Sequence, residues 1–307
     1  MKERTLKKLV IAGASGAIGS ALAAQAVGLG YEVVGLSRTP RPSGKVRWVT
    51  WTLSAKDAWA QEIEGAAAVI NLTGASVIGK RWSPSYKKEL LESRLKTTSV
   101  LVEAMKLAKS KPAVFINGSA VGIYGDQGPL WLDEEAPAGK DFLAGLAGAW
   151  ESLAMTAEKS GIRTVVLRTG VVLDTASGAL ASLLTPFRLF AGGPVLPGTQ
   201  YVPWIHVEDE TGLIFHAIDN PSVSGPLNAA APEPVPFKEF ASVLGRVLGR
   251  PSWLPVPAFA LRILLGEAAV ILTASQRVRP AKALGTGYSF RFSSLEPALR
   301  DLLKQPA

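Results

Sequence analysis

Three glycines near the start of the chain have the spacing of a phosphate-binding turn. A short apolar run, Leu9–Ala12, leads into Gly13, Gly16 and Gly19, and an alanine-rich helical pattern follows. Gly13 permits a tight turn, Gly16 lets the backbone approach a phosphate, and Gly19 lets a helix pack closely on the strand. A strand, a glycine turn and a helix N-terminus together form a pyrophosphate site, so the stretch predicts a bound dinucleotide. The expected contacts come from Gly13, Ser15, Gly16, Ala17, Ile18 and Gly19.

The end of the second expected strand indicates which dinucleotide is bound. Folds that bind NAD usually carry Asp or Glu about 20 residues after the glycines, on the ribose 2′-hydroxyl. Here Leu36 is followed by Ser37 and Arg38, and the next carboxylate is Asp57. A serine hydroxyl and the planar fork of an arginine match a 2′-phosphate, so NADP is the predicted cofactor. The alternative is that Arg38 is a solvated loop residue.

The composition excludes several kinds of site. The chain has 307 residues, no cysteine and two histidines. Disulfides, thiolate metal ligands and cysteine nucleophiles are therefore excluded, and a histidine-rich metal site is disfavoured, so no metal is expected. The net charge of +8 would suit nucleic acid or an anionic membrane, but basic and acidic residues alternate, as in Lys87–Lys96. A solvated surface around a basic cofactor cleft explains the charge better.

The longest apolar stretch after the middle of the chain is Ala258–Ala274. It contains Arg262 and Glu267, so it does not suit a membrane span and predicts a buried amphipathic helix. We expect a cytoplasmic protein, a monomer or homodimer, that takes a small-molecule substrate and needs neither nucleic acid nor a membrane.

These chemical groups must be positioned by a regular alternation of strands and helices. Near-continuous apolar strands separated by helices predict a doubly wound parallel α/β sheet of Rossmann type. Residues 1–175 are expected to form the NADP-binding domain, with later segments returning to it. Residues 176–307 are expected to form mainly a smaller mixed substrate lobe with C-terminal helices. The expected strands are Lys7–Ala12, Glu32–Leu36, Val46–Thr50, Ala68–Asn71, Ala113–Asn117 and Thr164–Arg168; the helices are Pro84–Ala108, Phe142–Lys159, Phe237–Leu248 and Ala258–Ala274.

Several motifs occur together in one order along the chain. They are GASGAIG, NLTG (71–74), GSAVGIYG (118–125), LRTGVVL (167–173) and WIHVED (204–209). In this combination the chain resembles the extended short-chain dehydrogenase/reductase superfamily, in particular its atypical NAD-dependent epimerase/dehydratase-like branch. Residues 244–267 and 276–290 resemble the small C-terminal domain of unknown function that ends this branch.

The resemblance implies further cofactor contacts. Leu72, Thr73 and Gly74 follow the fourth strand, where the adenine side of a dinucleotide is expected. On the next helix the family brings the positions of Glu89 and Arg94 toward the nucleotide, although the residues alone would suit a helix surface. Ser119 and Val171 are implied near the nicotinamide half.

The chain departs from its superfamily at the expected catalytic pair. Short-chain reductases place Tyr and Lys one helical turn apart, so that the lysine lowers the pKa of the phenol that transfers a proton. Alignment through Glu151 puts Leu143 and Ala147 at these positions. No tyrosine is followed four residues later by lysine: Tyr31, Tyr86, Tyr124, Tyr201 and Tyr288 are followed there by Gly35, Leu90, Gly128, Ile205 and Phe292.

The remaining catalytic candidates are Ser119 and Tyr124. The resemblance implies that the serine binds the substrate oxygen and that the tyrosine lies beside the substrate. Tyr124 is either a substitute acid or an aromatic that caps the cleft. Arg188, Gln200, Trp204 and His206 are candidates for lining a substrate pocket, with packing as the alternative for Trp204 and loop orientation for His206.

Two functions from different classes fit these residues. One is an NADP-dependent oxidoreductase or epimerase that acts on a small carbonyl or sugar-nucleotide substrate. The other is a non-catalytic protein that senses NADP(H) or docks a partner when loaded. The missing tyrosine–lysine pair favours the second, whereas hydride transfer needs mainly positioning and electrostatics from the protein, which keeps the first open.

Overall fold

A seven-stranded parallel sheet forms the centre of the molecule. The computed structural model describes residues 7–42, 44–78, 80–176 and 178–304, so the outermost ends of the two expected domains lie outside the described residues. The order β3-β2-β1-β4-β5-β7-β11 reverses direction at β1 and β4, as the predicted doubly wound fold requires. This prediction is confirmed. The strands are β1 (Lys8–Ala12), β2 (Glu32–Ser37), β3 (Arg47–Thr50), β4 (Ala68–Asn71), β5 (Val114–Ala120), β7 (Arg163–Thr169) and β11 (Gly225–Ala229).

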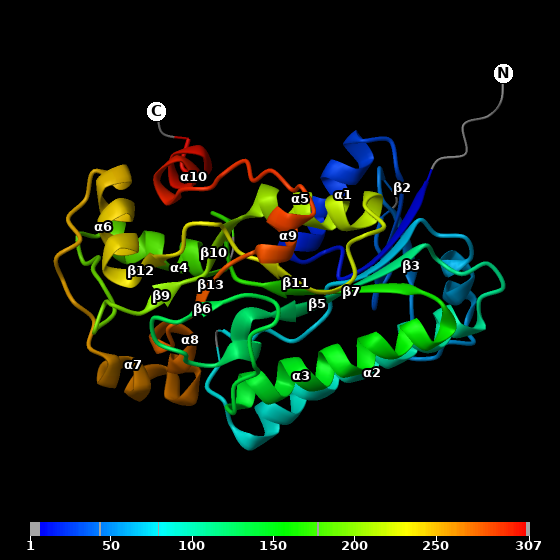
Figure 1. Ribbon diagram of the computed structural model, residues 1–307, viewed down its shortest axis with the longest axis horizontal. Coiled ribbons are helices and arrows are strands. Elements are labelled where there is room, and N and C mark those ends of the chain that lie inside the picture. The colour runs from blue at the N-terminus through cyan, green and yellow to red at the C-terminus, as the bar shows by residue number, and fades with distance from the viewer. Residues whose placement is uncertain (1–6, 43, 79, 177, 305–307) are drawn as a thin grey trace.

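Both faces of the sheet are covered by helices. Leu9 and Ile11 of β1 pack with the helices α1 (Ala17–Gly28) and α5 (Val207–Asp219), while Val10 and Ala12 face the opposite layer. That second layer contains α2 and α3, which lie side by side below the sheet in Figure 1. Because both faces are buried, the strands are apolar along their length rather than alternating. These two helices span Pro84–Leu107 and Phe142–Met155.

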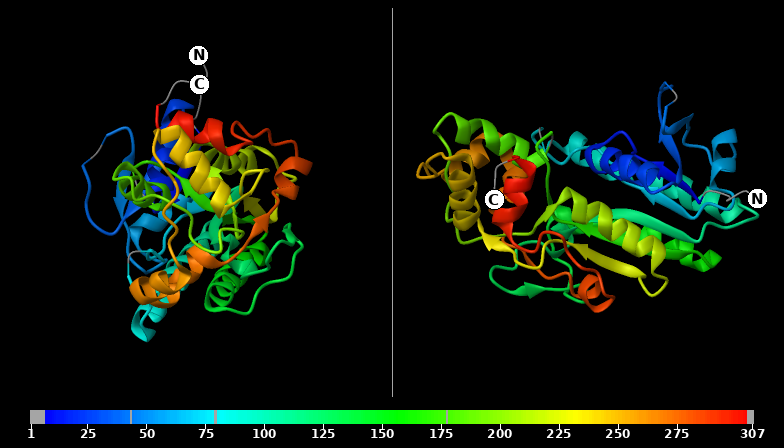
Figure 2. Two further views of the ribbon diagram at one scale, coloured as in Figure 1. Left: turned by 90° about the vertical axis from the view of Figure 1, so that its left-hand side faces the viewer. Right: turned by 90° about the horizontal axis from the view of Figure 1, so that it is seen from above.

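Helices gather in a second lobe at one end of the sheet (Figure 2). Phe240, Leu244 and Leu299 belong to an apolar core of their own there. The segment after residue 175 also supplies β11 to the main sheet, and the domain division at this residue stays a prediction. The helices of the lobe include α4 (Gly178–Arg188), α6 (Phe237–Leu248) and α10 (Leu295–Leu302).

Short two-stranded pairs connect the lobe with the sheet. The parallel pair β8 (Val171–Leu173) and β10 (Trp204–His206) directly follows β7 and precedes α5. The other pairs are β9 (Tyr201–Val202) with β12 (Val235–Pro236) and β6 (Trp131–Leu132) with β13 (Arg277–Val278), and the short helix α9 (Ala281–Gly285) follows.

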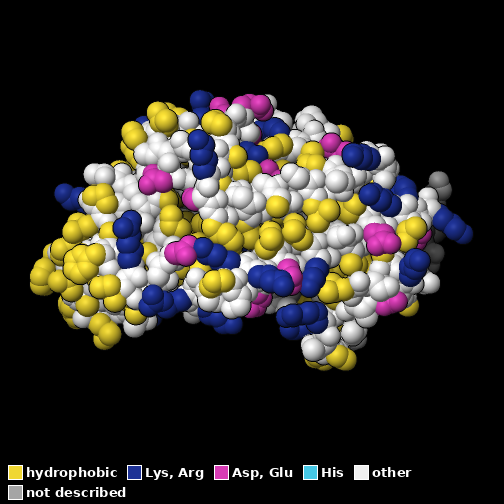
Figure 3. Space-filling model, turned by 90° about the horizontal axis from the view of Figure 1, so that it is seen from below, with side chains coloured by type: hydrophobic (Ala, Val, Ile, Leu, Met, Phe, Trp, Pro, Cys, Tyr) yellow, Lys and Arg dark blue, Asp and Glu magenta, His cyan; other side chains and the backbone are white. Residues whose placement is uncertain are grey.

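The expected buried helix at Ala258–Ala274 is wrong. The segment divides into α7 (Ala258–Leu265), a 3₁₀ turn and α8 (Val270–Thr273), because Gly266 adopts a left-handed φ of 63°. Phe259, Ile263 and Leu264 of this segment are exposed. Figure 3 shows apolar side chains gathered at the same end of the molecule. None of the helices in the described ranges is long and apolar enough to cross a membrane, and the same ranges contain no cluster of metal-ligating side chains.

Candidate functional site

A cavity of about 460 Å³ lies between the carboxyl edge of the sheet and the second lobe. Leu72, Ser119 and Val171 reach it from the ends of the strands, and Phe240 and Leu272 reach it from the lobe. A second hollow of about 440 Å³ lies beside it; the two share Asp141, Leu143 and Val270. Ligands of doubly wound folds bind at this edge of the sheet, so we take the first cavity as the candidate site.

The glycine turn has the geometry that a pyrophosphate requires. A Cβ on Gly13, whose φ is 87°, would lie 2.8 Å from the backbone carbon of Leu72, and one on Gly19 would lie 2.2 Å from the Gly13 oxygen. A Cβ on Gly16 would fill the approach to the exposed turn without meeting any atom closer than 3.4 Å. Helix α1 has no side-chain cap and no acidic residue in its first turn. Its N–H groups and positive dipole end therefore fit an anionic phosphate. Ser15 and Ala17 are exposed on this turn, and Ile18 lines the cavity.

The end of β2 carries a second arginine that sequence reasoning missed. Ser37 is buried, and its Oγ accepts a hydrogen bond of 3.3 Å from Nε of Arg41. The Arg41 guanidinium also lies 5.0 Å from the ring centre of Trp48. Arg38 is exposed beside it. Two cations thus accompany the serine at the predicted ribose end. The signal was the second arginine of the RTPR stretch, four residues after Ser37.

A buried polar network holds the end of β4. Asn71 accepts a 2.6 Å hydrogen bond from the Thr73 hydroxyl and donates to Thr98 and Asn117 at 2.9 and 2.7 Å. Trp150 donates to the same Thr98 hydroxyl. Because these groups are buried and mutually satisfied, the backbone at Thr73 is fixed next to the glycine turn.

The structure separates Arg94 from Glu89. Arg94 lines the cavity, packs against Gly74 and donates to the carbonyls of Ala75 and Leu90. Its guanidinium lies 5.1 Å from the ring centre of Trp150, and burial lowers its pKa to about 10. Glu89 is exposed and is not among the described lining residues. The fold thus brings Arg94 to the cavity and turns Glu89 toward solvent.

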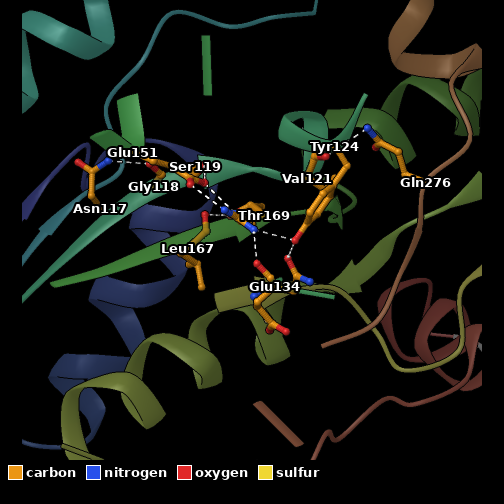
Figure 4. Close-up of polar contacts among 12 residues, drawn as sticks. Asn117, Gly118, Ser119, Val121, Tyr124, Glu134, Glu151, Leu167, Thr169 and Gln276 are labelled. Atoms are coloured by element: carbon orange, nitrogen blue, oxygen red, sulfur yellow. Dashed lines mark hydrogen bonds and ion pairs between the residues drawn. The ribbon is translucent and has the colours of Figure 1, made fainter. Parts of the chain in front are cut away.

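Ser119 is the end of a buried polar network that reaches the cavity (Figure 4). Its hydroxyl donates a 2.6 Å hydrogen bond to Oε1 of Glu151. Arg168 binds both oxygens of that carboxylate at 2.9 Å. Burial opposes the charge of Arg168, but the bonds to Glu151 prevail and hold its pKa above the ordinary value. Since the Ser119 proton is engaged by Glu151, the lone pairs of its oxygen remain free to accept a hydrogen bond.

Tyr124 lies in the buried network beside Arg168. The side chain is fully buried, and the residue is not among the described lining residues. Its hydroxyl donates to Oδ1 of Asn228 at 2.7 Å and accepts from Arg168 at 3.0 Å. Burial raises its pKa to about 12. Both its contacts and its pKa suit a group that holds Arg168 rather than a proton donor.

The four candidate pocket residues fall into two groups. Gln200 lines the cavity. Trp204 and His206 are buried elsewhere: the indole donates to the Glu233 carbonyl, and the imidazole stacks on Phe292 and accepts from the Glu208 amide at the start of α5. Arg188 ends α4 and is not among the described lining residues.

The helix that should carry the tyrosine–lysine pair presents small and apolar groups instead. Leu143 and Ala147 of α3, the two positions that alignment through Glu151 assigns to this pair, both line the cavity. Of the five tyrosines, Tyr201 is the one among the described lining residues. Sequence reasoning passed over it because it stands in a short strand outside the family motifs.

Comparisons with known proteins identify relatives along nearly the whole chain. YfhF of Bacillus subtilis, an epimerase family protein, is 38% identical over 298 residues, 96% of this chain and 97% of that protein. The human epimerase family protein SDR39U1, solved with NADPH, superposes with a TM-score of 0.90 at 34% identity and covers 97% of this chain and 99% of its own. A nucleoside-diphosphate sugar epimerase from Corynebacterium glutamicum has a TM-score of 0.78 at 30% identity, with 97% of this chain and 58% of that chain covered.

The family assignment follows from these matches and from two family models. Residues 256–302 match a domain of unknown function, DUF1731. Residues 9–230 match the other model, which spans nearly all of the sheet and the strand ends that border the cavity, and the chain belongs to the NAD dependent epimerase/dehydratase family.

Proposed function

We propose that this protein binds NADP(H) and catalyses hydride transfer with a carbonyl or sugar-nucleotide substrate. The cofactor assignment is supported by the open glycine turn, by Ser37 with its two neighbouring arginines, and by the NADPH bound to the human relative. When bound, NADPH supplies a hydride, and a carbonyl that takes up this hydride and one proton becomes an alcohol.

The observation that carries the proposal is the orientation of Ser119. Its hydroxyl donates to Glu151, which Arg168 holds in place, so its oxygen presents an acceptor to the cavity. A substrate hydroxyl would donate to this oxygen and be fixed at the sheet edge near Val171. We assign the substrate contact to Ser119, and the positioning of Ser119 to Glu151 and Arg168.

The proposed site works without the usual tyrosine–lysine pair. Leu143 and Ala147 contribute no titratable group, and the Tyr124 hydroxyl is already hydrogen-bonded to Asn228 and Arg168. Water entering the cavity therefore supplies the proton to the substrate oxygen, and Ser119 accepts a hydrogen bond from the hydroxyl that forms.

A matched pair of substitutions within one network tests these roles. The purified protein is given NADPH and a panel of aldehydes, ketones and quinones, and the nicotinamide absorbance band is followed. Ser119→Ala should slow cofactor oxidation roughly 100-fold while NADPH still binds, because it removes the substrate contact. Tyr124→Phe should lower the melting temperature and slow oxidation far less than Ser119→Ala, because the two bonds from Arg168 to Glu151 remain. Loss of turnover in Tyr124→Phe without loss of stability would return the acid role to that residue.

The second candidate function is an NADP(H)-loaded sensor or interaction protein. The pair of inert side chains at Leu143 and Ala147 favours it, because a protein that only binds cofactor needs no proton donor. Tight NADPH binding without oxidation by any member of the panel would support this function over the enzyme.

A further inference from the structure

The half of the cavity that faces the second lobe has apolar walls. These walls come from α4, α6, β9 and α8, all outside the strand ends that border the proposed cofactor site. Aliphatic and phenyl groups offer neither charge nor hydrogen bonds, and they favour a ligand with apolar surface. The side chains are Leu183, Val202, Phe237, Phe240, Ile271 and Leu272.

Charged groups are scarce around the same cavity. Among the described lining residues, Arg94 is the one cation and Asp141 the one carboxylate. Arg94 packs against Gly74 on the cofactor side, away from the lobe. The neighbouring hollow adds Arg262 and Glu267, and Glu267 forms an ion pair with Lys87. A nucleoside diphosphate needs charge-assisted donors for its phosphates, and the apolar half supplies none from its described side chains.

Gln200 adds one specific polar feature to the apolar half. The residue is only 4% exposed, and its Nε2 donates to the carbonyls of Val195 and Leu272 at 3.0 and 3.2 Å. These two acceptors fix the orientation of the amide, since Oε1 in the same place would face two carbonyl oxygens. Oε1 is buried without a hydrogen-bond partner among the described residues. A buried acceptor of this kind is costly unless a ligand donates to it.

We propose that the substrate is a hydrophobic ketone or aldehyde that carries a hydroxyl group, and not a nucleotide sugar. Its carbonyl lies at the sheet edge near Val171, its hydrocarbon body fills the apolar half, and its hydroxyl donates to Oε1 of Gln200. The hydride step in this assignment rests on the proposed function, but the binding preference does not.

Binding to the full chain, with and without saturating NADPH, tests the preference without requiring turnover. The ligands are 2-pentanone, 2-nonanone, 9-hydroxy-2-nonanone and UDP-glucose, followed by calorimetry and by quenching of the eight tryptophans. Each added methylene should strengthen ketone binding by up to about fourfold. The hydroxyl should add roughly another fivefold, and UDP-glucose should bind more weakly than either nonanone.

Two glutamines of the cavity provide a matched pair of variants. Gln276 also lines it and also donates through Nε2 to two backbone carbonyls, those of Val121 and Gly125, but its Oε1 is not a buried atom without a partner. Gln200→Met should abolish the preference for hydroxynonanone over nonanone, whereas Gln276→Met should keep it. The preference is the ratio of the two affinities, for hydroxynonanone and for nonanone, measured within each variant. A general loss of stability lowers both affinities alike and does not change this ratio.

The outcomes separate this inference from the proposed function. Binding that grows with chain length and loses its hydroxyl preference in Gln200→Met supports the inference, even if no ketone is reduced. Tighter binding of UDP-glucose than of the nonanones overturns it and leaves hydride transfer to a sugar nucleotide intact. Equal binding of short and long ketones, or no binding of either, also overturns it. Failure to bind NADPH overturns the proposed function alone.

Discussion

At the scale of single residues, the preference for NADP depends on the end of β2. Arg38 is exposed next to the buried Ser37, and Arg41 already donates to the serine hydroxyl. The 2′-phosphate distinguishes NADP from NAD, and a guanidinium binds it with charge-assisted hydrogen bonds. We expect Arg38→Ala to weaken NADPH binding by about tenfold or more and NADH binding hardly at all. Fluorescence titration with both cofactors measures the two affinities.

A cation elsewhere on the surface controls for general charge effects. Lys56 is exposed and follows β3 rather than β2. Lys56→Ala should change neither affinity. An equal loss for NADPH and NADH in Arg38→Ala would refute the assignment of this arginine to the 2′-phosphate.

Four of the predicted site residues that reach the cavity are tied to strand ends. Leu72, Thr73, Ser119 and Val171 lie at or just past the ends of buried strands of a parallel sheet, and such strand ends meet at one edge whatever the details of packing. The sequence did not identify Glu151 as a member of the site, because Glu151 lies on a helix and is 32 residues further along the chain than Ser119, whose hydroxyl it binds. Contacts of that kind depend on how two elements pack, and no local pattern encodes them.

At the scale of the elements, the glycine turn contains one glycine that cofactor binding requires and another that folding requires. Gly16 has a φ of −77° and room for a Cβ, whereas a Cβ on Gly19 would overlap the Gly13 carbonyl between β1 and α1. We therefore expect Gly16→Val to fold normally and to lose NADPH binding, because its side chain fills the phosphate approach. Gly19→Val should instead lower the melting temperature sharply, because the helix can no longer pack on the strand. Calorimetry and thermal denaturation measure the two effects.

The control for that pair is the last residue of the same helix. Nothing lies within 4 Å of a Cβ on Gly28, so Gly28→Ala should leave both binding and stability nearly unchanged. Unchanged NADPH affinity in Gly16→Val would show that the turn does not hold the phosphates.

Element boundaries show where pattern reasoning succeeds. Periodicity and caps predict α2 and α6 closely, because Ser83 and Pro84 start one helix and Gly249 ends the other. Helix α3 ends at Met155, four residues before the expected end, and continues as a 3₁₀ turn. The apolar composition of the segment Ala258–Ala274 predicts a helix but does not define its length, and Gly266 inside it was the signal of the break.

At the scale of the whole molecule, the start of α5 connects the C-terminal segment to the sheet. The buried carboxylate of Asp209 accepts hydrogen bonds from the Tyr288 hydroxyl and from the backbone N–H groups of Arg291 and Phe292. Nε2 of His206 lies 3.3 Å from Oδ2 of Asp301 in α10. These contacts assign to WIHVED a structural role in joining the lobes, which explains why His206 is absent from the described cavity lining.

The neighbouring Glu210 makes the stability of the whole fold depend on pH. It is fully buried, accepts a hydrogen bond from Thr169, and burial raises its pKa from the ordinary 4.5 to about 8. Between these two pKa values the folded protein keeps a proton on Glu210 that the unfolded chain releases. The stabilisation of the fold by protonated Glu210 is therefore complete below pH 4.5 and is lost as the pH rises to about 8.

The loss amounts to on the order of 5 kcal/mol in the free energy of unfolding. Glu210→Gln cannot titrate, so its melting temperature should match that of the natural protein near pH 4.5 and exceed it increasingly up to pH 8.5, with denaturant unfolding giving the free energies. Glu103→Gln, which alters an exposed carboxylate on α2, should show no such divergence. Parallel curves for the natural protein and Glu210→Gln would mean that this carboxyl is ionised in the fold, with a partner that the buried contacts around Thr169 do not reveal.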